Sequence, residues 1–188
     1  TTDPDMKPVS QREISFGAEK KLTEDLSLSV RLVQKHLIRT IEDIGFAGLG
    51  GEIYYNANPG SPYIQEKSRE ILSNSGPDGI EGTADDQTGE DYWAQPDAKR
   101  EYYGMNVSLE KRFSHNWQGG INYTLSRVEG NYSGLSSADE GGRNSPNVER
   151  FFDFWYMMFR LDGERLDGRL PQDRTHYFKA YGSYAFPF

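Results

Sequence analysis

The feature that most restricts the fold is a long alternation of apolar and polar residues with a period of two. From 100 to 113, Tyr103, Met105 and Val107 alternate with Asn106 and Ser108. The alternation recurs in five segments, near residues 12–21, 25–38, 100–113, 117–128 and 175–186. A period of two is typical of a β-strand with one apolar face. Each segment has about ten residues or more, the length that a tilted strand needs to cross a bilayer.

The connections between these segments alternate between short and long. Residues 23–25 separate the first two segments, and residues 114–116 separate the third and fourth. Long loops, near 40–98 and 130–173, separate the others. Membrane barrels have short periplasmic turns and long outer loops, whereas compact soluble domains seldom contain two loops this long. The sequence therefore predicts one all-β domain over 1–188, an antiparallel meander of about five long strands forming part of a transmembrane β-barrel wall with two long extracellular loops.

The aromatic residues, 13% of the chain, lie where a membrane would place them. Phe113, Trp117 and Phe186 fall near the short-turn ends of their segments, and Tyr103 and Phe178 nearer the long-loop ends. Two aromatic girdles around an apolar band are a feature of membrane barrels. A soluble antiparallel sandwich with aromatics in its core would show the same alternation and stays open as an alternative. No apolar run reaches the roughly 20 residues of a membrane helix.

The acidic residues gather in the first long loop. Residues 41–97 contain twelve of the 29 acidic residues and two basic ones, and the chain's net charge of −8 argues against nucleic-acid binding. Within this loop the candidate metal ligands are Asp78, Glu81, Asp85 and Asp86, which lie among glycines. Oxygen-rich loops of this kind suit Ca²⁺, so calcium is the one cofactor considered. The alternative is a solvated acidic loop with a turn at residues 77–79.

A helical pattern stands in the second long loop. Ser145 is a good N-cap, and Pro146 suits the first helical position. Apolar residues follow at helical spacing, namely Val148, Phe151, Phe152, Trp155 and Phe159. The sequence therefore predicts a short helix in this loop, packed over the mouth of the barrel.

The motifs of catalysis are missing. His36, His115 and His176 are far apart, there is no cysteine, and neither a nucleophile elbow nor a phosphate-binding glycine loop occurs. An enzyme is therefore not expected. The polar residues 173–176 (DRTH) could line the barrel mouth, but an intraloop salt bridge and a cap at the start of the last strand are the favoured interpretation.

Three stretches carry a resemblance to a known family. Residues 102–117 (YYGMNVSLEKRFSHNW), continuing through 123–127 (YTLSR), resemble the barrel hairpins of TonB-dependent outer-membrane receptors, with the Oar-like branch most similar. Residues 3–8 leading into 13–17, and residues 170–179 (LPQDRTHYFK), also look like strand beginnings in that family. The resemblance implies a plug domain, a TonB box and a barrel of about 22 strands. None of these is visible in the sequence, and five strands are fewer than the smallest membrane barrels contain, so an internal slice of a barrel is expected.

The leading hypothesis is a transport protein of the Gram-negative outer membrane that binds an extracellular ligand and takes it up with energy supplied through TonB. Its expected partners are outer-membrane lipid, the rest of the barrel, a plug domain, the TonB system through parts outside this chain, and a ligand that the sequence does not identify. Charged residues expected to line the lumen wall are Glu19, Arg31, Glu110, Arg112 and Lys179. The alternatives are a secreted all-β binding module with an acidic loop and an outer-membrane surface protein or adhesin.

Overall fold

The structure is a computed structural model that describes residues 1–48, 51–72, 94–134, 151–152, 158 and 165–187. It divides into two compact units. The sheet unit comprises Arg12–His36, Glu101–Val128 and Gln172–Phe188. The loop unit comprises Thr1–Gln11, Leu37–Arg100 and Glu129–Pro171. None of the helices in the described residues is long and apolar enough to span a membrane.

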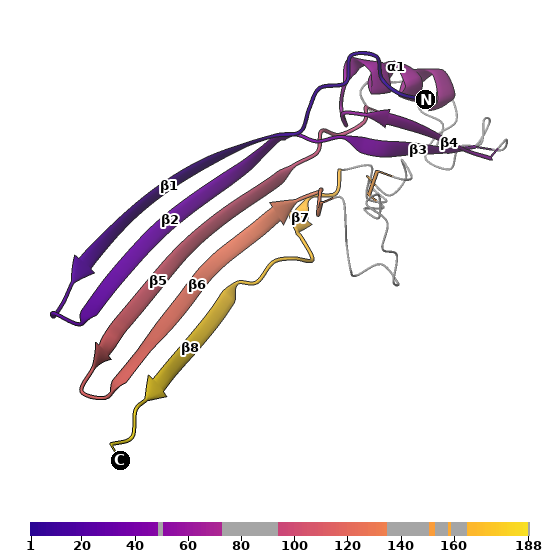
Figure 1. Cartoon of the computed structure of the whole chain (residues 1–188). Coiled ribbons are helices and arrows are strands. Elements are labelled where there is room, and N and C mark those ends of the chain that lie inside the picture. The colour runs from indigo at the N-terminus through magenta and orange to yellow at the C-terminus, as the bar shows by residue number, and fades with distance from the viewer. Residues whose placement is uncertain (49–50, 73–93, 135–150, 153–157, 159–164, 188) are drawn as a thin grey trace. The chain divides into compact units, whose positions relative to one another are not determined.

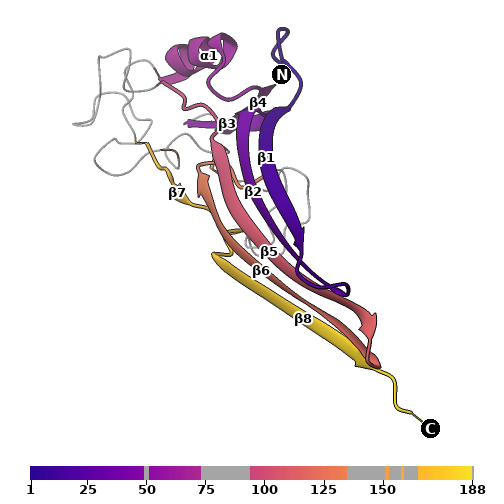
Figure 2. The ribbon, with the colours of Figure 1, turned by 90° about the vertical axis from the view of Figure 1, so that its left-hand side faces the viewer.

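Five long strands form one antiparallel sheet. They are β1 (Ser10–Lys21), β2 (Leu26–Arg39), β5 (Arg100–Ser114), β6 (Trp117–Gly130) and β8 (His176–Tyr184). The strands lie in the order β1-β2-β5-β6, and β8 pairs with the other edge of β6 (Figures 1 and 2). The short β7 (Gly168–Arg169) pairs with the end of β6. The predicted all-β meander of about five long strands is thus confirmed, and within the described residues the sheet is not closed.

The strand register keeps like side chains together. Between β2 and β5, Val30 faces Val107 while Ser29 faces Ser108. Between β6 and β8, apolar Ile121 likewise faces Ala180. Because successive side chains of a strand point to opposite faces, this register gives the sheet one apolar and one polar face.

The two short turns close as the sequence predicts. In the β1–β2 turn the Thr23 hydroxyl donates to Asp25 Oδ1 at 2.6 Å and accepts from the Leu26 N–H at 3.1 Å. In the β5–β6 turn, His115 and Asn116 have φ values of 50° and 63°. Two successive residues with positive φ are the geometry of the tight hairpin turns whose twist matches that of the flanking strands.

The first long loop contains regular structure that the sequence pattern does not predict. It holds the hairpin of β3 (Glu42–Gly48) and β4 (Gly51–Ala57) and the helix α1 (Pro62–Leu72). Ser61 caps this helix: its hydroxyl accepts from the Ile64 N–H, and Pro62 occupies the first helical position. The prediction of a plain loop near 40–98 is therefore wrong for residues 42–72. The two strands have seven residues each and include glycines, so their local signal is weak.

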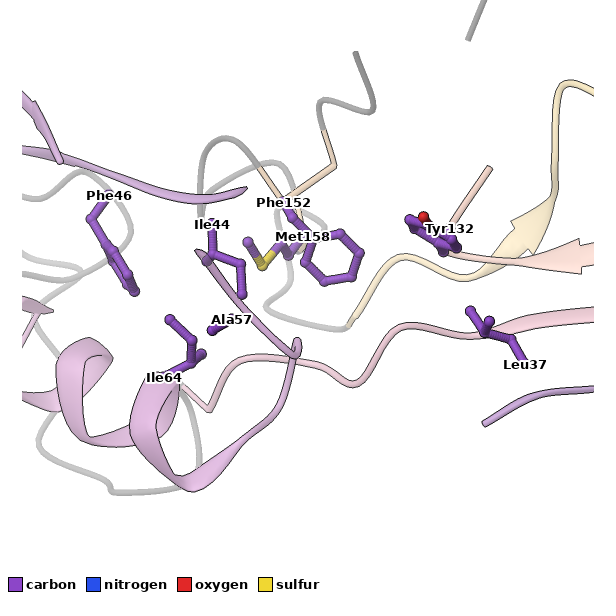
Figure 3. Close-up of a cluster of buried hydrophobic side chains, with 8 residues drawn as sticks. All are labelled: Leu37, Ile44, Phe46, Ala57, Ile64, Tyr132, Phe152 and Met158. Carbon is purple, nitrogen blue, oxygen red and sulfur yellow. The ribbon is translucent and has the colours of Figure 1, made fainter. Parts of the chain in front are cut away.

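A small apolar core holds this hairpin and helix together. Its fully buried members are Ile44, Phe46, Ala57, Ile64, Phe152 and Met158, with Leu37 and Tyr132 beside them (Figure 3). The Gly45 N–H donates to the Phe152 carbonyl at 2.9 Å, which fixes the second long loop to β3. Burial of these side chains, rather than strand propensity, accounts for the order of the loop unit. The helix predicted to begin at Ser145 lies mostly outside the described residues and stays a prediction.

Candidate functional site

The polar face of the sheet carries paired charges at its β1–β2 edge. Glu13 lies 3.1 Å from Lys35 Nζ and 3.8 Å from Arg31 Nη2. Arg31 also donates to the Ser15 hydroxyl at 3.3 Å. These side chains are well exposed, so the pairs are solvated and each contributes little to stability. The group marks a water-facing surface.

Farther along the same face, polar side chains bond to each other across β5, β6 and β8. Thr124 donates to Asn106 Oδ1 at 2.7 Å, and Ser108 donates to Asn122. Lys179 lies opposite Asn122 in the register. Of the five charged residues expected on the wall, Arg31, Glu110 and Lys179 lie on this face by register, and alternation along β1 and β5 places Glu19 and Arg112 there as well.

The opposite face of the sheet is apolar and exposed. Phe16, Leu32 and Phe178 are 71%, 50% and 62% exposed. Further large apolar side chains on this face are also exposed, namely Ile14, Val30, Phe113, Trp117, Ile121, Leu125 and Tyr184. So wide an apolar surface is unfavourable in water but is what the lipid-facing wall of a barrel presents.

At the short-turn end, a charged cluster sits at the border of this apolar face. Lys111 Nζ lies 3.0 Å from Asp25 Oδ2 and 4.4 Å from the centre of the Trp117 ring. Hydrogen bonds from Ser114, Thr23 and Lys111 hold the pKa of Asp25 well below its usual range. The aliphatic stem of Lys111 can thus lie on the apolar face while its ammonium reaches the turn, as long basic side chains do at membrane interfaces.

A wide groove of 780 Å³ lies on the sheet unit near this cluster. Its lining includes Leu109, Trp117, Gly119, Gly182 and Tyr184. Most of these side chains belong to the apolar face. We therefore assign the groove to the lipid-facing wall and not to a transported ligand.

The loop unit contains a second, more polar pocket of 560 Å³. Its charged and polar residues come from distant parts of the chain, and they are Asp3, Asp5, Lys7, Arg39, Thr40, Asn58, Ser61 and Asp97. Pro59, Pro62 and Tyr63 form apolar parts of its wall. No local sequence pattern joins these residues, so the sequence alone does not predict the pocket. We call this the loop-unit pocket.

Buried hydrogen bonds fix the floor of the loop-unit pocket. Asn58 accepts from the Lys7 N–H at 2.7 Å and donates to the Thr40 carbonyl at 2.6 Å. Asp3 accepts from the Asp5 N–H at 2.8 Å and from the Ser61 hydroxyl at 3.1 Å. Asp3 and Asn58 are 4% and 7% exposed, so their polar groups are satisfied within the protein and held in place.

A buried polar pair borders the core. The Thr40 hydroxyl donates to the Tyr132 hydroxyl at 2.9 Å. Burial is the main cause that raises the pKa of Tyr132 to about 12. The phenol therefore stays neutral and serves a structural role.

The predicted calcium ligands Asp78, Glu81, Asp85 and Asp86 lie outside the described residues, so the calcium site stays a prediction. Within the described ranges, no three His, Asp or Glu side chains gather as metal ligands would. Asp173 does act at the start of β8 as its sequence context predicts. It accepts from the Val128 N–H at 2.8 Å and from the Thr175 hydroxyl at 3.1 Å.

Comparison with known proteins agrees with this geometry. The family described as outer membrane beta barrel domain matches residues 1–188. The chain is 30% identical over 184 residues to the TonB-dependent transporter Oar of Myxococcus xanthus, an alignment that covers 98% of this chain and 14% of that protein. No solved structure matches the chain.

These findings confirm the predicted resemblance, the Gram-negative outer-membrane location and the expectation that this is not an enzyme. They do not reach the plug, the ligand or the TonB contacts, because the chain spans only 14% of the length of the curated relative. With one face of the sheet polar and the other apolar, the chain belongs to the outer-membrane β-barrel domain family.

Proposed function

We propose that the protein is a TonB-dependent receptor that takes up a ligand across the outer membrane. The five long strands form part of its barrel wall. The observation that carries the proposal is the separation of the two faces of the sheet, with Val30 and Val107 on one and Ser29 and Ser108 on the other. The relative named as a TonB-dependent transporter supports the transport role.

The orientation follows from the lengths of the connections. In outer-membrane barrels the short turns face the periplasm and the long loops face outward. The β1–β2 and β5–β6 turns would therefore be periplasmic, and the segments of the loop unit extracellular. On this basis the loop unit contributes to the surface that a ligand meets first.

Energy for uptake would come through partners outside this chain. A plug domain that fills the barrel and a segment that contacts TonB are the parts a receptor of this class requires. The polar face of the sheet, with Arg31, Glu110 and Lys179, would then form water-filled or plug-facing wall. The secreted-module alternative is set aside because the family is an outer-membrane family.

Comparative depletion of growth medium tests the proposal while the ligand is still unidentified. The bacterium that carries the complete protein, a strain lacking it and a strain lacking TonB are grown in the same complex medium. Mass spectrometry of the spent medium then compares what each has consumed. We expect one set of compounds to remain in the medium of both deletion strains.

An unchanged depletion profile in the receptor-deletion strain would contradict uptake. If that strain instead lost attachment to surfaces or to other cells, the adhesin alternative would replace the proposal. Complementation with the wild-type gene controls for secondary effects of the deletion.

A further inference from the structure

The loop-unit pocket has the size of a small-molecule site. Its volume of 560 Å³ lies within the roughly 300–1,000 Å³ of ligand pockets. Its floor is fixed by the buried hydrogen bonds of Asp3, Thr40 and Asn58. Such a floor is largely formed before a ligand arrives, which lowers the entropic cost of binding.

Charged groups of both signs line this pocket. Lys7 and Arg39 supply cations, and Asp5 and Asp97 supply carboxylates. Within the described part of the chain, none of these four side chains forms an ion pair with another protein group. Their charges are thus available to a ligand.

Asp97 is placed in the pocket by a glycine. Gly60 has a φ of 77°, which favours glycine, and a Cβ there would overlap Asp97 Oδ1. The missing side chain therefore makes room for the Asp97 carboxylate beside the turn that precedes α1. On the other side of the charge balance, Arg39 is held by a bond from its Nε to the Pro8 carbonyl at 3.1 Å. That bond leaves its terminal guanidinium nitrogens for a ligand.

This mixture of charges selects the chemistry of the ligand. A polyanion would meet the carboxylates of Asp3, Asp5 and Asp97, and a polycation would meet Lys7 and Arg39. A molecule with one ammonium and one carboxylate satisfies both sets. The apolar surfaces of Tyr63, Pro59 and Pro62 suit the body of such a molecule.

We propose that the loop-unit pocket binds a short peptide, or a peptide-like molecule, through its free ammonium and carboxylate groups. The carboxylate binds Arg39 and Lys7, and the ammonium binds Asp97 and Asp5. This inference rests on the proposed receptor function, since it names the class of ligand that the receptor would capture.

Calorimetric titration of the complete protein in detergent micelles tests the proposal. The probes are trialanine, N-acetyl-trialanine, trialanine amide and the doubly blocked peptide. We expect free trialanine to bind and each single block to weaken binding by about tenfold or more, the effect of losing a hydrogen bond to a charged group. Equal binding of all four peptides, or no binding of free trialanine, would overturn the proposal.

Variants assign the two ends of the peptide. Asp97→Asn should weaken binding of trialanine and of trialanine amide, but not that of N-acetyl-trialanine, which has no ammonium. Arg39→Gln and Lys7→Gln should show the reverse selectivity. Arg12→Gln, a change of an exposed arginine on β1 outside the pocket, is the matched control and should bind as the wild type does.

Binding and uptake can fail separately. The titration uses no energised membrane, so its result does not depend on transport. Peptide binding without TonB-dependent depletion of medium would contradict the proposed uptake and leave the pocket assignment standing. Depletion without peptide binding would leave the receptor function standing and overturn the pocket assignment.

Discussion

Tyr181 of β8 donates a hydrogen bond of 2.5 Å to Glu110 Oε2 of β5, although β6 lies between these strands. Gly120 of β6 lies where the two side chains meet. A Cβ at Gly120 would come within 2.7 Å of both Glu110 Oε2 and the Tyr181 ring. The glycine thus lets an aromatic side chain cover its strand and connect three strands on the polar face.

Gly120→Ala should displace Tyr181 and lower the free energy of unfolding by about 1 kcal/mol, the usual contribution of one hydrogen bond. Denaturant unfolding in detergent micelles measures the change. Gly17→Ala is the control on the same face, because its Cβ would meet nothing closer than the Val30 carbonyl oxygen at 3.5 Å. Equal losses in both variants would show that the Tyr181–Glu110 contact is not the cause.

Asp25→Asn should weaken the cluster of Lys111, Ser114 and Thr23 at the short-turn end. The folded-state pKa of Asp25 is lowered, so its stabilising contribution is complete at neutral pH and is lost as the pH falls below about 4. The stability difference between wild type and Asp25→Asn should therefore shrink in acid. A difference that grows or stays constant between pH 7 and pH 3 would contradict this assignment.

Tyr132→Phe should change the stability of the loop unit in alkali. Burial raises the folded-state pKa of Tyr132 to about 12, above the usual value near 10. Its contribution is complete below pH 10 and is lost as the pH rises from 10 to 12. The phenylalanine variant should lack this part of the pH dependence, which thermal unfolding between pH 8 and pH 12 measures. An unchanged profile would mean that the phenol does not titrate as its burial predicts.

Phe46→Ala should open a cavity in the core of the loop unit and cost about 3–5 kcal/mol there. Because this core holds β3, β4 and α1 in place, the variant should be cleaved faster by added protease within residues 40–72. Val9→Ala, at a side chain that is 54% exposed, is the control. Identical cleavage of the two variants would favour the plain loop that the sequence pattern predicts.

The sheet could be predicted because its information is local. The alternation through Tyr103, Met105 and Val107 identifies a strand and its apolar face without reference to any other segment. The tight turn at residues 114–116 then sets the neighbour of that strand. Long segments of this kind specify their own register once one face must meet an apolar environment.

The loop unit could be predicted only in part. Ser61 and Pro62 carry the same helix-start signal as Ser145 and Pro146, and at the first position the structure has α1. The signal alone does not predict α1, because few apolar residues follow it at helical spacing: within the helix, Ile64 is a fully buried side chain, and Ser68 follows one turn later. The pocket needs Lys7, Arg39 and Asp97 together, and only the fold of the chain joins such distant residues.

The central claim is that alternate residues of each long strand meet lipid and water. Spin labels at Val107→Cys and Ser108→Cys, in the complete protein reconstituted in a bilayer, test it at two adjacent positions of β5. We expect the label at 107 to be accessible to oxygen dissolved in the lipid and shielded from a water-soluble nickel chelate, with the reverse at 108. Equal access of the nickel chelate to both labels, or equal shielding of both, would contradict the membrane-wall assignment.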